Sequence, residues 1–166
     1  YLCNKLIKRS LFKDITIPNL YYSEDYYLLS ILYSKAIKIS TDSAVIYYYL
    51  RHPESATKQP VTTRHLDVIR AGEMVLNFYK KNFPMLSVYA KSYILQFAIQ
   101  LSVKTYLSAN STSNNKMLYI YFFRKFKQFY DLSVFLKTKS VKILFFRYFP
   151  RLYLSIAKVK HISLGL

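Results

Sequence analysis

The chain contains no tryptophan, one cysteine, two glycines and five prolines among its 166 residues. The lone Cys3 excludes an intrachain disulfide, as expected for a protein of a reducing cytoplasm. The scarcity of glycine and proline argues against a fold dominated by loops. The three histidines lie far apart, at positions 52, 65 and 161, so the Cys and His spacing of a zinc site is missing.

Acidic residues are also scarce, because 8 Asp and Glu stand against 25 Lys and Arg, for a net charge of +17. Residues 1–61 have a net charge of +3 and residues 62–166 one of +14. Such a charge favours anionic partners, such as lipid headgroups, nucleic acid or phosphorylated substrates. The sequence has neither a secretion signal nor the run of about 20 mostly apolar residues that a transmembrane helix needs.

Bulky apolar side chains are abundant. The sequence has 18 Tyr and 12 Phe, and 52% of its residues are hydrophobic. Disordered chains are poor in these residue types, whereas 166 residues suffice to enclose a core. The composition therefore predicts a folded protein of one domain or two small ones.

The hydrophobic pattern divides the chain at Gln59-Pro60. The first region predicts a mixture of strands and one helix. Residues 6–12 suggest a short strand or turn, residues 24–36 a helix with Ser23 as its N-cap, and residues 37–50 a strand rich in tyrosine.

The second region, residues 62–166, predicts almost only helices. Thr63 is expected to cap the first of them, whose buried stripe comprises Val68, Ala71, Val75 and Phe78. Pro84 suits the first turn of the next helix, and Pro150 is expected to break or kink the chain. The expected helices cover residues 63–81, 84–107, 116–137 and 139–148.

Three short motifs follow one another in the first region. They are Asn4-Lys5-Leu6-Ile7-Lys8-Arg9-Ser10-Leu11-Phe12, then Ser23-Glu24-Asp25-Tyr26, then Tyr47-Tyr48-Tyr49-Leu50-Arg51-His52-Pro53-Glu54-Ser55. Their order and spacing resemble the second half of an inverting bacterial glycosyltransferase of family 2. The resemblance implies an α/β, Rossmann-like GT-A fold, with residues 1–60 as the acceptor side of the catalytic domain and residues 61–166 as a helical extension.

The same resemblance implies that the donor-binding half precedes residue 1, since the chain has no initiator Met and no Asp-x-Asp motif. That half holds the divalent metal, Mn or Mg, and the nucleotide sugar in this family. We therefore expect this chain to be inactive alone and its metal ligands to be absent. The missing tryptophan also excludes the Gln-x-x-Arg-Trp motif of processive synthases, which favours a single addition.

Glu24 and Asp25 are the candidate catalytic residues. Carboxylates in a first helical turn commonly only complement the helix dipole. Asp25, however, begins the apolar stripe of its helix and is expected to point toward the protein body, whereas Glu24, about 100° away, is expected to be structural or solvated. The resemblance implies that Asp25 deprotonates the acceptor hydroxyl.

Arg51, His52, Ser55 and Lys5 are the candidate substrate-binding residues. Taken alone, residues 51–55 resemble a polar turn after a strand, and a basic cluster such as that around Lys5 is usually solvated surface. The resemblance places Arg51 or His52, with Ser55, near the donor phosphates. It places Lys5, Lys8 and Arg9 along the acceptor side, where one of them is expected to meet a phosphorylated lipid carrier.

The helical region suggests a membrane surface. Basic amphipathic helices rich in Phe and Tyr lie on anionic membranes, where each cation near the surface contributes about 1 kcal/mol. Residues 116–160 hold eleven Lys and Arg and a single acid, Asp131. We therefore expect a cytoplasmic protein, peripheral on the inner face of the cell membrane.

The sequence leaves three functions open. The first is sugar transfer from a nucleotide sugar to a lipid-linked glycan, with inversion, in the synthesis of a capsule, exopolysaccharide or O-antigen. The second is a non-enzymatic, basic membrane-surface protein, which leaves the motif order in residues 4–55 unexplained. The third is nucleic-acid binding, which the charge and the tyrosines would suit. We expect no nucleic acid, because no recognised motif is present and most tyrosines have the spacing of core residues.

Overall fold

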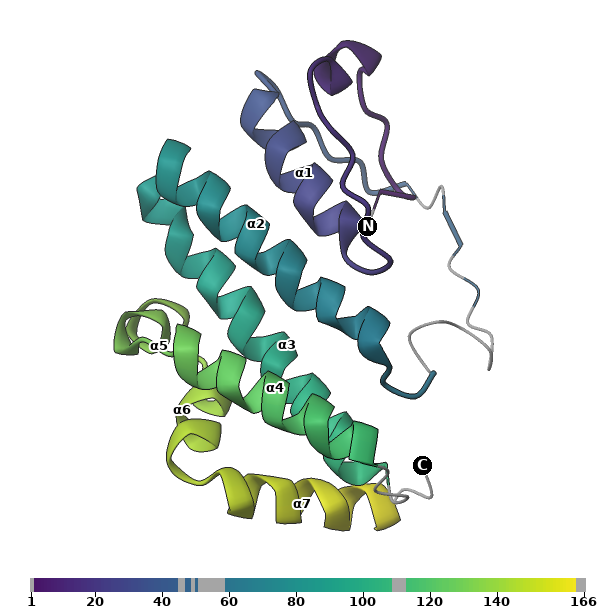
Figure 1. Ribbon diagram of the computed structural model, residues 1–166. Coiled ribbons are helices and arrows are strands. Elements are labelled where there is room, and N and C mark those ends of the chain that lie inside the picture. The colour runs from purple at the N-terminus through teal and green to yellow at the C-terminus, as the bar shows by residue number, and fades with distance from the viewer. Residues whose placement is uncertain (1, 45–46, 49, 51–58, 109–112, 164–166) are drawn as a thin grey trace.

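The computed structural model describes residues 2–44, 47–48, 50, 59–108 and 113–163, with side chains up to Val159. In this part of the chain the regular structure is entirely helical (Figure 1). The helices are α1 (Glu24–Lys35), α2 (Leu66–Asn82), α3 (Ser87–Leu107), α4 (Ser113–Phe129), α5 (Leu132–Thr138), α6 (Val141–Tyr148) and α7 (Pro150–Ser163). Short 3-10 helices cover Arg9–Phe12, Thr63–His65 and Pro84–Leu86.

The expected α/β GT-A fold is wrong for the residues that the structure describes, because none of them forms a strand. Residues 37–44 and the described tyrosines Tyr47 and Tyr48, predicted as a strand, are neither helix nor strand and are mostly exposed. Residues 9–12 form a 3-10 helix. The physical reason is that a strand is stable only with a ladder partner, and the described segments supply none.

Helix α3 is the centre of the fold. It packs against α2 on one side and α4 on the other, and it also contacts α5, α6 and α7. Its apolar residues point in several directions, and Ala90, Ile94, Leu95, Ala98 and Ile99 are fully buried. A helix that is apolar all round is expected in the interior of a protein. The interior of the molecule is therefore built around α3.

Helices α2 and α3 cross at close range where Gly72 faces Ile94. A Cβ atom on Gly72 would lie 2.5 Å from Cγ1 of Ile94, closer than real side chains approach one another. Glycine at this position removes the side chain that would separate the two backbones. The predicted stripe of α2 is largely confirmed, since Val68, Ala71 and Val75 are buried, although Phe78 is only half-buried.

The chain turns after α4, within the range where one helix over residues 116–137 was expected, and turns again after α5, at the expected boundary before residue 139. The predicted helix 116–137 is interrupted at Tyr130 and Asp131, and the Asp131 carboxylate caps α5 by accepting the N–H of Ser133 at 2.9 Å. Lys139, with φ of 53°, ends α5 in the left-handed region. Pro150 begins α7, as its lack of an N–H allows at a first helical position.

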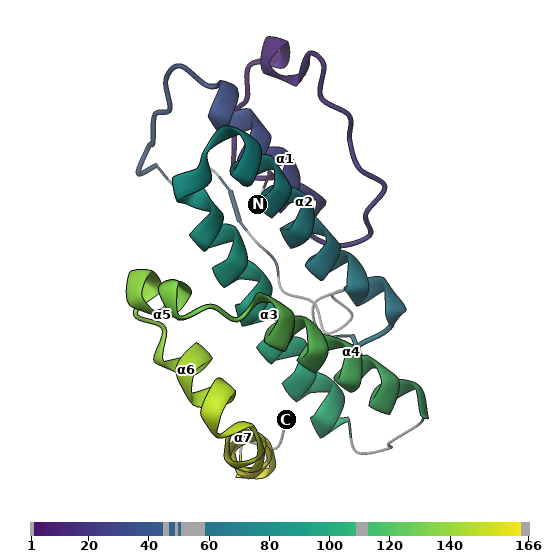
Figure 2. The same ribbon diagram turned by 60° about the vertical axis from the view of Figure 1, so that its left-hand side comes forward.

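Aromatic side chains join the helices after α4 to one another. The ring of Phe146 in α6 lies 5.0 Å from that of Phe126 in α4 and 5.3 Å from that of Tyr153 in α7, in edge-on arrangements. Pairs of this geometry contribute about 0.5–1.5 kcal/mol beyond the burial of their surface. Figures 1 and 2 show α7 along the outer edge of the molecule, on the far side of α3 from α1.

Replacement of Gly72 tests the close crossing of α2 and α3. We expect Gly72→Val to lower the free energy of unfolding by about 1–3 kcal/mol, because the new side chain overlaps Ile94. The measurement is urea unfolding followed by circular dichroism. Arg70→Val, at an exposed position of the same helix, is the matched control and should change stability by less than about 0.5 kcal/mol. Equal stability of Gly72→Val and the control would contradict the close packing.

Candidate functional site

The two candidate catalytic carboxylates, Glu24 and Asp25, form the first turn of α1 as the sequence predicts. Ser23 precedes the helix with φ of 65°, in the left-handed region, and its side chain makes no capping hydrogen bond. The capping role expected of the Ser23 hydroxyl is therefore wrong. One oxygen of Asp25 accepts the N–H of Tyr26 at 2.7 Å, which fixes the carboxylate at the end of the helix.

The apolar stripe that follows Asp25 on α1 is buried, whereas Asp25 itself is only half-buried. Leu28 and Leu32, on the same stripe, are 4% and 1% exposed, so this face does pack inward. Glu24 and Asp25 are both half-buried. Burial alone therefore does not separate the proposed base from its neighbour.

Tyr93 of α3 contacts both the residue before the carboxylate pair and the residue after it. Its ring stacks on that of Tyr26, with the centroids 3.7 Å apart and the planes 5° apart. Its hydroxyl donates a hydrogen bond to Oγ of Ser23 at 2.7 Å. Burial raises the pKa of Tyr26. No local pattern signals this contact, because Tyr93 lies 70 positions from Ser23 and sits in a run of apolar residues.

The loop before α1 is also attached to the start of α2. The N–H of Tyr21 donates to Oδ2 of Asp67 at 2.8 Å, and the guanidinium of Arg64 lies 4.3 Å from the centre of the Tyr21 ring. The ring of Tyr22 lies 4.5 Å from that of His65. The first turn of α1 is thus anchored to both α2 and α3.

His65 completes a cap of the 3-10 helix Thr63–His65, which leads into α2, and the cap residue lies one position before the predicted Thr63. The cap is Thr62, whose N–H donates to Nδ1 of His65 at 3.1 Å, in a reciprocal capping box. The imidazole is buried, and burial lowers its pKa below the usual 6.5. Lys104 adds a smaller effect in the same direction.

Of the candidate substrate-binding residues, only Lys5 lies within the described part of the chain. Lys5 is half-buried, and its Nζ donates to Oδ1 of Asn4 at 2.6 Å. It lines a hollow of about 970 Å³ between residues 4–8, residues 38–42 with Ala44 and Tyr47, and the far end of α1. Neither carboxylate of the first turn lines this hollow. Arg51, His52 and Ser55 lie outside the described residues.

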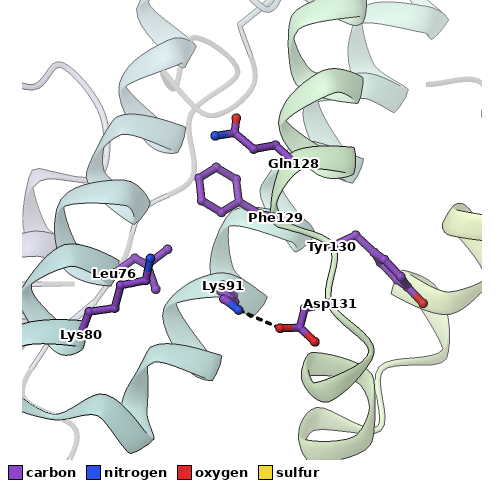
Figure 3. Close-up of a pocket in the computed structure, with 7 residues that line it drawn as sticks. All are labelled: Leu76, Lys80, Lys91, Gln128, Phe129, Tyr130 and Asp131. Carbon is purple, nitrogen blue, oxygen red and sulfur yellow. Dashed lines mark hydrogen bonds and ion pairs between the residues drawn. The ribbon is translucent and has the colours of Figure 1, made fainter.

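A second hollow, of about 460 Å³, lies between α2, α3 and the turn into α5 (Figure 3). There Lys91 Nζ donates to Oδ2 of Asp131 at 2.8 Å, and Tyr130 points away from this pair. Together with the N–H of Ser133, Lys91 lowers the pKa of Asp131 to about 2. The pair links α3 to α5, which is a structural role. The other lining residues are Leu76, Lys80, Gln128 and Phe129.

The described part of the chain contains neither a metal site nor a helix that could cross a membrane. No three His, Cys, Asp or Glu side chains there lie close enough together to hold a metal ion. The described residues therefore supply no site for the divalent metal, which the resemblance assigns to the donor-binding half. None of the helices within the same residues combines the length and apolarity needed to cross a bilayer.

No protein-family model, curated protein or solved structure matches this chain. The resemblance to family 2 glycosyltransferases therefore rests on the motif residues themselves.

Removal of the Tyr93 side chain tests the attachment of α1. Tyr93→Phe deletes one hydrogen bond and should cost about 0.5–1.5 kcal/mol, whereas Tyr93→Leu also deletes the ring stack and should cost more. Hydrogen exchange should show that the amides of α1 lose more protection than those of α2. Tyr153→Phe in α7 is the matched control. Equal loss of protection in every helix would contradict a local role.

Titration of His65 tests the cap of α2. The folded protein prefers the neutral imidazole, so the unfolded chain binds the proton more readily, and stability should fall as the pH drops below about 6.5. Urea midpoints measured between pH 8 and pH 5 should fall more steeply for the native chain than for His65→Asn. The other two histidines are common to both proteins, so parallel curves would contradict the role of His65.

Proposed function

We propose that this chain supplies the acceptor-side carboxylate of an inverting glycosyl transfer. The reaction moves a sugar from a nucleotide sugar to a lipid-linked glycan of a bacterial surface polysaccharide. The observation that carries the proposal is the position of Glu24 and Asp25, in a helical turn anchored at Ser23 and Tyr26. The proposal rests on this turn and on the motif order of residues 4–55, and not on an α/β fold.

The chemistry requires an ionised general base at a fixed position. The N-terminal end of a helix favours the charged form of a carboxylate, and a base must lie within hydrogen-bond reach of the proton that it takes. Asp25 accepts the proton of the acceptor hydroxyl. The hydroxyl oxygen then attacks the anomeric carbon from the side opposite the nucleoside diphosphate, which leaves with its bonding electrons, so the configuration inverts.

The remaining substrate contacts are proposals from the resemblance. Arg51 and His52, with Ser55, neutralise the charge that develops on the diphosphate, since Arg and His donate strong hydrogen bonds to phosphate oxygens. Lys5 contacts the phosphate of the acceptor carrier. No step is assigned to a metal ion, because the described residues of this chain do not form a site for one.

The proposed location is the cytoplasmic face of the cell membrane. The net charge of +14 on residues 62–166 supports it, because anionic lipid headgroups attract such a surface. A lipid-linked acceptor is itself confined to the membrane, so attachment there brings the base and its substrate into the same layer.

Replacement of Asp25 tests the proposed base. Asp25→Asn, introduced into the complete product of the gene, should lower sugar transfer to membrane-bound acceptor by about a hundredfold to ten-thousandfold. Membranes supplied with a panel of labelled nucleotide sugars provide the assay. Glu24→Gln should have a smaller effect. The matched control is Asp14→Asn, an exposed residue at φ of 62°, a conformation that Asn tolerates, and it should leave transfer unchanged.

A second candidate, a non-enzymatic membrane-surface protein, is favoured by the exposed cations and apolar side chains of α4 to α7. Normal transfer by Asp25→Asn, with the protein folded and present at its usual amount, would reject the catalytic proposal. Membrane binding that survives in that variant would then support the second candidate.

A further inference from the structure

Helix α7 has two apolar stripes, of which only one is packed. Leu154, at 4% exposure, and Tyr153 face the interior, where α7 contacts α3 and α6. The second stripe is exposed to solvent. It starts at the residue before the helix and comprises Phe149 (57% exposed), Leu152 (51%), Ile156 (41%) and Val159 (66%).

The four residues of this second stripe, called the α7 stripe below, share one side of the helix. Their intervals of three, four and three residues match the helical period. Phe149 belongs to the row because its carbonyl accepts the first hydrogen bond of α7, from the N–H of Tyr153 at 2.9 Å. Large apolar side chains scattered singly on a surface need no explanation, but an ordered row of four indicates a binding surface.

Cations border the α7 stripe, and acids are missing around it. Arg151 and Lys158, seven residues apart and both exposed, lie on the neighbouring side of α7, and the exposed Arg147 lies in the last turn of α6. The sequence from Leu132 to Ser163 contains no Asp or Glu. This surface therefore combines exposed apolar groups with charge of one sign.

We infer that α7 lies in the surface layer of an anionic bilayer, with the α7 stripe among the upper acyl chains and Arg151 and Lys158 at the headgroups. An apolar row beside Lys and Arg is the pattern of helices that lie in the plane of the interface. The inference deepens the membrane location proposed above and rests on it, but it is independent of Asp25. The location proposed above requires only charge attraction, whereas this inference adds the insertion of a defined row of side chains.

Two other occupants fit the α7 stripe less well. Only Phe149 of the four presents a ring on which a nucleic-acid base could stack, whereas Leu152, Ile156 and Val159 present none, and such stacking is the main apolar contact of single strands. A symmetric dimer through this stripe would bring Arg147, Arg151 and Lys158 close to their own copies, and like charges across an interface oppose association. A lipid surface satisfies both the apolar row and the cations.

The place of α7 in the molecule suits this arrangement. Figure 1 shows α7 lengthwise along the outer edge of the molecule, with no other helix on its outer side, and Figure 2 shows it end-on at the lower edge. Helix α1 lies beyond α3 at the other end of the molecule. A bilayer can therefore contact α7 along its length without displacing the rest of the fold.

Because the protein has no tryptophan, the fluorescence of one introduced indole reports on a single position. Phe149→Trp places a single indole at the start of the α7 stripe. With vesicles of equal parts phosphatidylcholine and phosphatidylglycerol, its emission should shift to shorter wavelength, and lipids brominated along the acyl chain should quench it. The matched control is Tyr89→Trp, at a 48% exposed position near the start of α3, which should show neither effect.

Two double variants separate insertion from charge. Leu152→Gln with Ile156→Gln should weaken vesicle binding at least about tenfold even in high salt, because burial of each side chain favours binding by roughly tenfold or more. Arg151→Gln with Lys158→Gln should weaken binding mainly at low salt, since charge attraction is screened. All four positions are exposed, so both proteins should keep the native circular dichroism spectrum.

Three results would overturn the inference. One is an unshifted or equally shifted emission for Phe149→Trp and the α3 control. Another is a shift that follows protein concentration without lipid, which would indicate pairing of two copies through the α7 stripe. The third is salt-sensitive binding of an oligonucleotide, weakened by the same variants, in a protein that ignores vesicles. Vesicle binding is measured without substrate, so its failure is distinct from failure of the Asp25 assay.

Discussion

The burial of α3 between α2 and α4 is the constraint on which the other parts of the structure depend. Its apolar residues face several directions, so the helix is stable only when neighbours cover it on more than one side. Gly72 lets α2 approach closely, and α4 covers another side with Phe122 and Phe126. The later helices then attach through aromatic contacts to this three-helix centre.

The candidate site depends on the same helix. Tyr93 extends from α3 to stack on Tyr26 and to bind Ser23, so the core also determines where the first turn of α1 lies. The Glu24–Asp25 pair is thereby attached to α3, which belongs to the helical region that the sequence suggested only for membrane attachment. Described residues of the two predicted regions, 1–60 and 61–166, therefore pack against one another. The boundary between the regions stays a prediction.

The helical part of the fold was largely predictable, because periodic apolar residues, Pro84 and the basic ends mark helices locally. The limits of α1, α2 and α3 agree with the expected ranges to within about three residues. The strand at residues 37–50 was wrong in the described positions, since high strand propensity does not provide a ladder partner. The break at Asp131 was missed because its ion pair with Lys91 joins residues 40 positions apart.

The sequence by itself determined the helical character of the second region, the charge and the motif residues, including Glu24 and Asp25 at the start of a helix. These properties depend on neighbours along the chain, such as periodic spacing, prolines and local charge. Only the tertiary structure decided that Tyr93 anchors α1, that His65 is buried, and which of the two apolar stripes of α7 is covered. A pattern of apolar residues shows which side of a helix avoids water, but the packing of other helices decides which side is actually covered.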